Sequence, residues 1–358
     1  MVAYWFLFLV PALAAWQERV QYLDKPPRLY LLTGIGIIFT LMIGLRYLVG
    51  ADWNNYLIYL DIGRVDTLQQ VMLESNPGYI LTNWISANTI DTIWVVNILC
   101  AVIFCYGLVE FCRSQPRPYL AILVSVPYLV IVVAMGYSRQ GVAIGAVMLA
   151  WVAITRDRSL VRFFLWVAFA TTFHKTALLL APIFALSMDR GRLWNVCWIG
   201  AATVLLYYLF LRQDLDDLLS MYIGAQYNSE GAAIRVAMNA VPAAIFLAAR
   251  KRFFLSSFEL RLWTNVSFLA MLCIVWLFLS PSSTAVDRMA LYLIPLQIMV
   301  FSRFPEIFPK LSPELAKGVT LAVILYFALV QFIWLNFATH SVAWIPYQIY
   351  PILSSETY

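Results

Sequence analysis

Residues 163–187 read FFLWVAFATTFHKTALLLAPIFALS, and this run decides how the chain crosses a membrane. It is apolar enough to enter a bilayer, yet basic sequences flank it on both sides, RDRSLVR at 156–162 and MDRGR at 188–192. Lys and Arg mark the cytoplasmic side of membrane proteins. We therefore expect the run to enter and leave from the cytoplasm, as a re-entrant or short-helix hairpin. A single ordinary span is the alternative, and it would place the RKR sequence at 250–252 outside.

The rest of the chain has the composition of a polytopic membrane protein. Of its 358 residues, 63% are hydrophobic and 12% are charged, which is too little charge to cover a soluble domain of this size. The net charge of +5 reflects basic loops and does not indicate a nucleic acid partner. We predict one all-α integral membrane domain over residues 1–358, with about ten transmembrane helices besides the hairpin. The apolar runs are approximately 2–16, 28–49, 93–112, 118–136, 139–155, 194–212, 232–249, 260–280, 288–304 and 317–339.

The linkers between these runs differ in charge. Stretches 50–92 and 213–231 are acidic and aromatic, so we expect both on the outer face. The hairpin topology places most of the 24 Lys and Arg residues on the cytoplasmic side and both termini outside. The hairpin turns at Phe173-His174-Lys175-Thr176, roughly 18 Å from its flanks at helical rise. Broken backbone at that depth lines a cavity or is buried in protein, so His174 and Lys175 should point into a cavity.

Four arginines lie at the ends of apolar runs, and the hairpin topology places all four at the outer face. Charge at membrane depth is costly, and it persists where an anion or an internal partner is present. Guanidinium binds phosphate oxygens bidentately and keeps its charge on burial. A polyprenyl diphosphate fits such a site, with its tail in lipid and its anion at the interface. The four residues are Arg46, Arg139, Arg235 and Arg288.

Two residues are candidates for a general base. Asp52 follows an early span, where a carboxylate can take the proton of an attacking hydroxyl. It could instead cap the next helix or pair with Arg46. His174 is one of only two histidines and lies in the broken element. Asp287 precedes Arg288 and either neutralises it or acts in catalysis, whereas Gly141 and Gly145 are typical of close helix packing.

Short motifs are spread along most of the chain. They are Gly44-Leu45-Arg46 through Gly50, Asp52 and Tyr56; Pro77-Gly78-Tyr79; Ser138-Arg139-Gln140-Gly141 with Ala143; Phe173-His174-Lys175-Thr176-Ala177 with Pro182; Asp287-Arg288 with Tyr292; and Trp344-Ile345-Pro346-Tyr347. Together these motifs resemble the EpsG-type, Wzy-like polysaccharide polymerases of bacterial envelopes. One departure is that the family often has Glu directly before Pro-Gly-Tyr, where this chain has Asn76 and its nearest acid is Glu74.

The resemblance implies a multi-pass enzyme of the bacterial inner membrane, similar to the GT-C class of glycosyltransferases, with its active site facing the periplasm. Such an enzyme moves a growing glycan from undecaprenyl diphosphate to a lipid-linked repeat unit, without nucleotide sugar. Since no DxD-like metal motif is evident in an outer loop, we predict no required metal or other cofactor. Its partners would be the lipid-linked oligosaccharide donor and acceptor and membrane lipid. A chain-length regulator would be a further candidate partner. The implied catalytic residues are Asp52 and His174; the implied diphosphate and substrate contacts are Arg46, Arg139, Arg235, Arg288, Lys175, Gln140, Tyr56, Tyr79, Asp287 and Tyr292.

Other membrane proteins could use a similar cavity. A flippase for lipid-linked oligosaccharides needs access from both faces, whereas these arginines favour one. An acyltransferase would also use an intramembrane histidine, but no HxxxD-like spacing surrounds His174. A ligase that moves finished glycan to lipid A core is the closest rival, and product analysis separates it from a polymerase.

Overall fold

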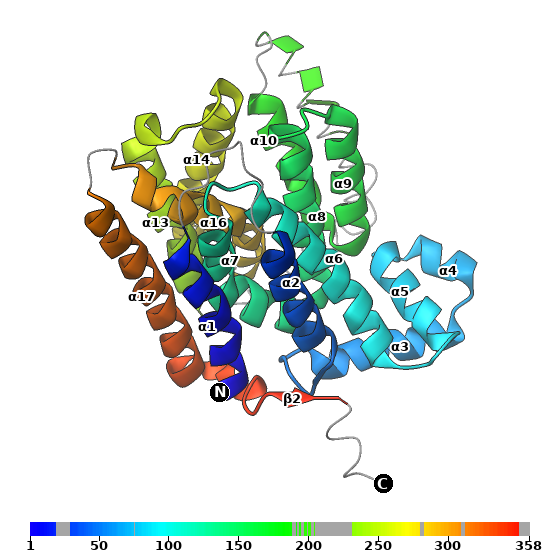
Figure 1. The fold of residues 1–358 in the computed structure, drawn as a ribbon. Coiled ribbons are helices and arrows are strands. Elements are labelled where there is room, and N and C mark those ends of the chain that lie inside the picture. Colours follow the sequence, from blue (N-terminus) through cyan, green and yellow to red (C-terminus); the bar gives the residue numbers. More distant parts are fainter. Residues whose placement is uncertain are drawn as a thin grey trace. The chain divides into compact units, whose positions relative to one another are not determined.

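The computed structural model is almost entirely helical (Figure 1). It describes residues 1–18, 29–74, 76–187, 231–279, 283–308 and 312–350, with isolated positions between 191 and 204. Most of the predicted span 194–212 and of the predicted outer loop 213–231 lies outside the described residues. The chain forms two compact units, residues 1–174 with 310–358 and residues 175–309, and each is described by itself.

The first unit contains most of the helices and a small two-stranded sheet. Its strands are β1 (Arg46–Tyr47) and β2 (Gln348–Ile349). Its helices are α1 (Val2–Gln17), α2 (Leu29–Gly44), α3 (Trp53–Val65), α4 (Leu68–Leu73), α5 (Pro77–Ala87), α6 (Ile93–Arg113), α7 (Pro118–Ser125), the π-helix η1 (Val126–Ala134), α8 (Ser138–Thr155), α9 (Leu160–Phe173), α17 (Pro313–Phe337) and the 3-10 helix η8 (Thr339–Ala343).

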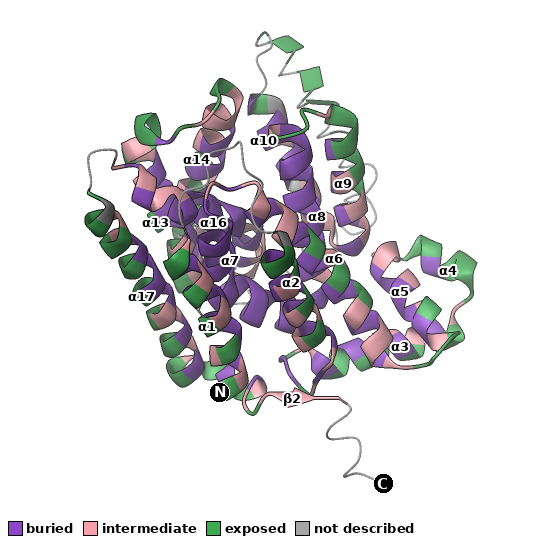
Figure 2. Ribbon diagram, in the orientation of Figure 1, coloured by how far each residue is buried: buried purple, intermediate pink, exposed green. Residues whose placement is uncertain are grey.

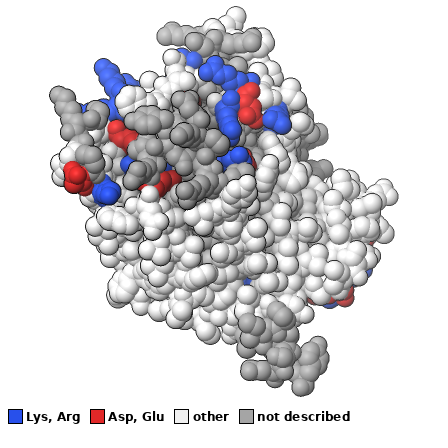
Figure 3. Space-filling view, in the orientation of Figure 1, with Lys and Arg blue, Asp and Glu red and all other residues white. Residues whose placement is uncertain are grey.

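The core of the first unit is built on α7, η1 and α8, which are buried on nearly every side because their sequences are apolar all round (Figure 2). Helix α6 packs closely on α8 through small residues: a Cβ on Gly145 would lie 2.7 Å from the Cα of Phe104. The predicted packing role of Gly141 and Gly145 is confirmed, since Gly141 likewise lies against Ala134. Around this core, α1 and α2 carry no charged residue and form an uncharged surface (Figure 3).

Three short helices, α3, α4 and α5, make up most of the segment 50–92 (Figure 1). Helices α3 and α5 pack so closely that a Cβ on Gly63 would lie 2.9 Å from the backbone of Asn83. Thr67 and Gln70 form a capping box that starts α4. These helices are too short to cross a bilayer of about 30 Å, in agreement with an extramembrane segment.

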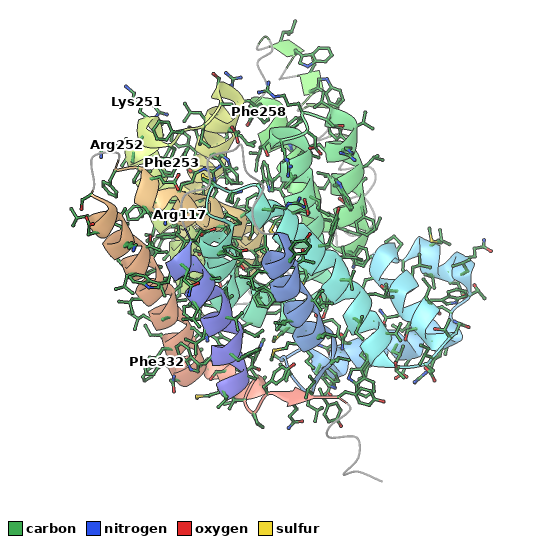
Figure 4. All side chains as sticks on the ribbon, in the orientation of Figure 1. Arg117, Lys251, Arg252, Phe253, Phe258 and Phe332 are labelled. Atoms are coloured by element: carbon green, nitrogen blue, oxygen red, sulfur yellow. The ribbon has the colours of Figure 1, made fainter. Side chains whose placement is uncertain are left out.

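The described part of the second unit is a set of mostly apolar helices. The basic turn η5 separates α13 from α14, and its Lys251 and Arg252 project outward (Figure 4). Its elements are η2 (Lys175–Leu179), α10 (Leu180–Ser187), α13 (Ala232–Ala249), η5 (Arg250–Arg252), α14 (Ser257–Leu279), α15 (Ser283–Ala290), η6 (Leu291–Leu293), α16 (Ile294–Arg303) and η7 (Phe304–Glu306).

Six helices in the described part of the chain are long and apolar enough to cross a membrane. Shorter apolar helices, among them α1, α2 and α9, accompany them. The predicted class of all-α, multi-pass membrane protein agrees with this architecture. The count of ten spans and the position of each end relative to the bilayer stay predictions. The six spans are Ile93–Arg113, Ser138–Thr155, Ala232–Arg252, Ser257–Leu279, Ser283–Glu306 and Glu314–Phe337.

The helix in the apolar run 163–187 is interrupted where the sequence predicted a turn. Helix α9 ends at His174, whose backbone is extended (φ −155°, ψ 114°), and the 3-10 helix η2 follows. The boundary between the two compact units falls between His174 and Lys175. The break at 173–176 is therefore confirmed, while the hairpin course across the membrane and the single-domain organisation stay predictions.

Candidate functional site

A short antiparallel sheet places Arg46 in the first unit. Helix α2 ends at Gly44, and β1 then pairs with β2, with Arg46 opposite Ile349. Gly50 follows with φ +106°, a conformation that favours glycine, and a Cβ there would lie 2.9 Å from the carbonyl oxygen of Met135. The Gly50 N–H donates to the Ala343 carbonyl at 2.8 Å. Two segments distant in sequence thus fix the chain on either side of Arg46.

Arg46 is only 1% exposed, and its guanidinium is held from three directions. It donates to the carbonyl oxygens of Ile43 (2.7 Å) and Val49 (3.3 Å) and to Ser138 Oγ (2.8 Å). The Trp53 ring lies 5.8 Å from its Cζ atom. Within the part of the chain that the structure describes, no carboxylate pairs with this guanidinium. Arg46 is therefore a buried cation held by dipoles, without a compensating anion.

Asp52 lies at the N-cap position of α3 and is half-buried. Its side chain makes no capping hydrogen bond to α3, and Asn55 Nδ2 donates to its Oδ1 at a long 3.4 Å. Because Arg46 directs its hydrogen bonds elsewhere, the alternative of an Arg46–Asp52 pair is wrong. The capping alternative is confirmed for the position of Asp52, but the expected side-chain hydrogen bond to the helix is not formed. The carboxylate is thus available for other chemistry.

Tyr56 joins α3 to the junction between η1 and α8. Its hydroxyl accepts a hydrogen bond from the Ser138 N–H (2.9 Å) and donates to the Gly136 carbonyl (3.3 Å). Burial, reinforced by the nearby charge of Asp52, raises the pKa of Tyr56 to about 12. The hydroxyl therefore stays protonated at neutral pH. It links Gly136 to Ser138 at the junction between η1 and α8.

Arg139 lies one residue after this junction, among tyrosine rings. Its Cζ atom is 4.7 Å from the centroid of the Tyr59 ring and 5.9 Å from that of Tyr79. The Tyr79 ring in turn lies 5.5 Å from Tyr59 and 5.9 Å from Tyr56. Such rings attract a cation through their quadrupole and leave guanidinium edges able to bind a further group. Gln140 is buried beside Arg139 at the start of α8.

The end of α9 also belongs to this region. A Cβ on Gly78, in the Pro-Gly-Tyr motif, would lie 3.0 Å from the Phe173 ring. The half-buried His174 follows Phe173 directly. The first unit therefore carries seven of the predicted site residues, in helices or turns that contact one another: Arg46, Asp52, Tyr56, Tyr79, Arg139, Gln140 and His174.

The second unit carries the other five, and a buried ion pair is the centre of this group. Arg235 donates through Nε and Nη2 to the two carboxylate oxygens of Asp287, the latter at 2.7 Å. Both side chains are at most 15% exposed. One helical turn along α13, Asn239 donates to the Ala290 carbonyl and accepts from Gln297. The sequence suggested Arg288 as the partner of Asp287, and it did not foresee the pairing with Arg235.

Arg288 is half-buried and lies near Tyr292, whose side chain approaches Thr176. This contact brings the Asp-Arg motif of α15 together with the element that begins at Lys175. The predicted gathering of all four arginines in one cavity stays a prediction, because Arg46 and Arg139 belong to one unit and Arg235 and Arg288 to the other.

Two residues beside Arg46 had no individual role in the prediction: Ser138, which accepts a hydrogen bond from Arg46, and Asn97, which lines the same pocket. Ser138 lies in one of the motifs quoted above, but its contacts are not visible from sequence. Asn97 carried a signal, since it is a polar residue inside an apolar run. Among the described residues, no three His, Cys, Asp or Glu side chains gather to hold a metal ion.

The fold and the site together define a multi-pass helical membrane protein whose first unit holds a buried arginine, Arg46, and a half-buried carboxylate, Asp52. The chain belongs to the EpsG family, whose model matches residues 29–349. This is a family of Wzy-like polysaccharide polymerases, so the chain has a polymerase or glycosyltransferase-type function and acts on lipid-linked oligosaccharides in a membrane. No curated protein and no solved structure matches the chain.

Proposed function

We propose that this protein polymerises a polysaccharide from undecaprenyl-diphosphate-linked repeat units at the outer face of the bacterial inner membrane. It transfers the growing glycan from its lipid diphosphate to the non-reducing end of a new lipid-linked unit. Membrane lipid surrounds it, a GT-C-like scaffold carries the site, and a chain-length regulator is a candidate partner. No nucleotide sugar or metal takes part.

The observation that carries the proposal is the uncompensated charge of Arg46. A buried cation without an anion is costly, and the cost falls when an anionic ligand arrives. Arg139, held over tyrosine rings nearby, provides a second cation in the same unit. Two guanidinium groups suit the two phosphates of a polyprenyl diphosphate.

The reaction needs one base and one stabilised leaving group. The acceptor hydroxyl attacks the anomeric carbon of the donor, its proton passes to Asp52, and the bond between that carbon and the diphosphate oxygen breaks. The diphosphate leaves with the electron pair and is stabilised by Arg46 and Arg139. His174 is the second candidate for the base. Gln140, Tyr56 and Tyr79 complete the substrate contacts of the first unit.

In the second unit, Arg288, Lys175 and Tyr292 are proposed as contacts to the second lipid-linked substrate. Arg235 and Asp287 take part as a pair whose charges offset each other, so their contribution to binding an anion is the smaller one. The proposal also includes the hairpin topology of 163–187, because only this topology places all four arginines at the outer face. Labelling of an Arg190→Cys variant from the outside alone would refute the hairpin.

The decisive experiment combines purified protein with a lipid-linked repeat unit, without nucleotide sugar or added metal. We expect a ladder of longer lipid-linked products, and no ladder with Arg46→Ala. Transport of the lipid-linked unit across vesicles in the absence of a ladder would identify a flippase instead. In cells, loss of the polymerase leaves single lipid-linked repeats, whereas loss of a ligase leaves long lipid-linked polymer, so the accumulated product distinguishes these two activities.

A further inference from the structure

A narrow pocket lies beside Arg46 in the first unit, between α6 and the junction of η1 with α8. One face of α6 provides Asn97, Cys100, Ala101 and Phe104, whose spacing of three, four and seven residues is that of a single helix face. The opposite wall comes from the end of α2, from β1, from η1 and from the first turns of α8; it consists of Ile43, Arg46, Ala134, Ser138, Gly141 and Val142.

Asn97 is the unexpected member of this lining. It is 1% exposed, and neither Nδ2 nor Oδ1 has a hydrogen-bond partner among the described residues. A buried carboxamide without partners costs free energy on both its donor and its acceptor. A structural asparagine in a membrane helix would bond a neighbouring helix or its own backbone, as Asn239 does in the second unit. Asn97 therefore lacks the bonding of a structural residue.

Arg46 and Asn97 line the same pocket. Among the described residues, Arg46 lacks a paired carboxylate and Asn97 lacks hydrogen-bond partners. Arg46 brings positive charge that no carboxylate of the described residues pairs with, and two of its five N–H groups remain after its three hydrogen bonds. Asn97 brings an unused amide donor, and the Ser138 hydroxyl, which accepts from Arg46, keeps its own proton for donation. Donors and positive charge that line one narrow pocket match the chemistry of an oxyanion.

We propose that Asn97 is a further substrate-binding residue, which donates through Nδ2 to a phosphate oxygen held beside Arg46. The inference rests on the proposed function, since the phosphate is that of the lipid diphosphate. It adds a residue on α6 to a site otherwise built from β1, α3 and α8. Its Oδ1 atom would accept from a hydroxyl next to that phosphate.

The test uses two substitutions that separate binding from stability. Asn97→Leu keeps the size but removes both polar atoms, so it should raise the melting temperature of the unliganded protein. The same change should weaken binding of farnesyl diphosphate by at least roughly tenfold, because a hydrogen bond to a charged group is lost. Asn97→Asp places a carboxylate in the pocket of Arg46; it should raise the melting temperature and abolish binding.

A matched control is Ser267→Ala in α14. Ser267 is also fully buried, and its Oγ has no hydrogen-bond partner among the described residues, so its removal should likewise stabilise the protein. Binding should be unchanged in this variant. A purely structural Asn97 would give the opposite pattern, with lower melting temperatures and unchanged affinity.

Four probes separate the outcomes: farnesyl diphosphate, farnesyl monophosphate, farnesol and inorganic diphosphate. The inference is overturned if farnesyl diphosphate binds the wild type better than farnesol and binds both Asn97 variants equally well. In that result the diphosphate role of Arg46 stands. If the wild type does not distinguish farnesyl diphosphate from farnesol, the proposed diphosphate site fails, and the role of Asn97 fails with it. Inorganic diphosphate could bind the wild type tightly and fail to bind Asn97→Asp. That result would support the phosphate contact and show that it does not need the lipid tail.

Discussion

The guanidinium of Arg46 donates to the hydroxyl of Ser138 at 2.8 Å and so joins the end of α2 to the first residue of α8, 92 positions later in the chain. The same Ser138 gives its N–H to Tyr56. One serine thus connects a buried cation, a tyrosine from the short helix α3 and the start of a core helix. The adjacent residue is Arg139, so the position of one arginine depends on that of the other.

The first prediction concerns the shape of Arg46 and not only its charge. Lysine has a single nitrogen and cannot reach two carbonyls and a hydroxyl in the guanidinium geometry. We expect Arg46→Lys to lose polymerisation almost as completely as Arg46→Ala, measured as the rate of ladder formation. Ser138→Ala removes one of the three contacts and should cost far less. Full activity of Arg46→Lys would contradict the proposed bidentate phosphate contact.

The second prediction concerns the aromatic support of Arg139. Tyr59→Phe keeps the ring 4.7 Å from the guanidinium and should leave substrate affinity nearly unchanged. Tyr59→Leu removes the ring and should weaken binding by about 0.5–1 kcal/mol, the usual contribution of a cation–π contact at a partly exposed site. Isothermal titration with a lipid diphosphate measures both variants. Equal losses in Phe and Leu variants would show that the hydroxyl, and not the ring, is required.

The third prediction concerns the buried pair in the second unit. Arg235→Met or Asp287→Leu alone leaves one buried charge without its partner, which should cost about 3–5 kcal/mol of stability. The double variant removes both charges and should recover most of that loss in thermal unfolding. We expect the double variant to keep more activity than Arg46→Ala. If it is as inactive as Arg46→Ala while fully folded, the pair contacts substrate directly.

The fourth prediction tests Asp52 as the base. Asp52→Asn should abolish ladder formation while binding of the lipid diphosphate remains, because the amide cannot accept the proton. Asp61→Asn is a matched control, since Asp61 lies on the same helix, is exposed and pairs with Arg64. It should be fully active. Full activity of Asp52→Asn would exclude Asp52 and turn attention to His174.

The fifth prediction concerns Trp344, which is 1% exposed and donates through Nε1 to the Ile131 carbonyl in the π-helix η1 (2.8 Å). Trp344→Phe leaves that carbonyl without its donor and should cost about 1–3 kcal/mol of stability. Because the indole also lies against Gly136, we expect a lower turnover rate at an unchanged Michaelis constant. Trp334→Phe changes the ring that packs on Trp344 and should have a smaller effect.

Charge and hydropathy were sufficient to predict the helical class, the absence of a long apolar span from the segment 50–92, and the break at His174. Each of these follows from a local pattern: an apolar run, an acidic and aromatic stretch, or a polar pair inside a run. Many residues of the short sequence motifs also lie close together in the first unit. This is expected, because neighbouring residues of one motif often place their side chains in the same region.

The pairings between distant residues could not be predicted. Nothing local to Arg235 indicates that Asp287 is its partner, since 52 residues separate them and Arg288 is the nearer cation. The bond from Trp344 to Ile131 crosses 213 positions and depends on a π-helix, for which the sequence has no clear signal. Asn97 could have been noticed as polar within a span, but only its missing partners distinguish it from a structural asparagine.

The sheet of β1 and β2 also affects when the chain can complete its fold during translation. The hydroxyl of Tyr347 donates to the Met42 carbonyl, a contact that spans 305 residues. At translation rates of about 5–20 residues per second, β1 waits roughly 15–60 s for its neighbouring strand. Throughout that time α1, α2 and α6 can insert, but β1 lacks the strand that pairs with it. A nascent chain is therefore expected to reach the membrane early and to become an active enzyme only late.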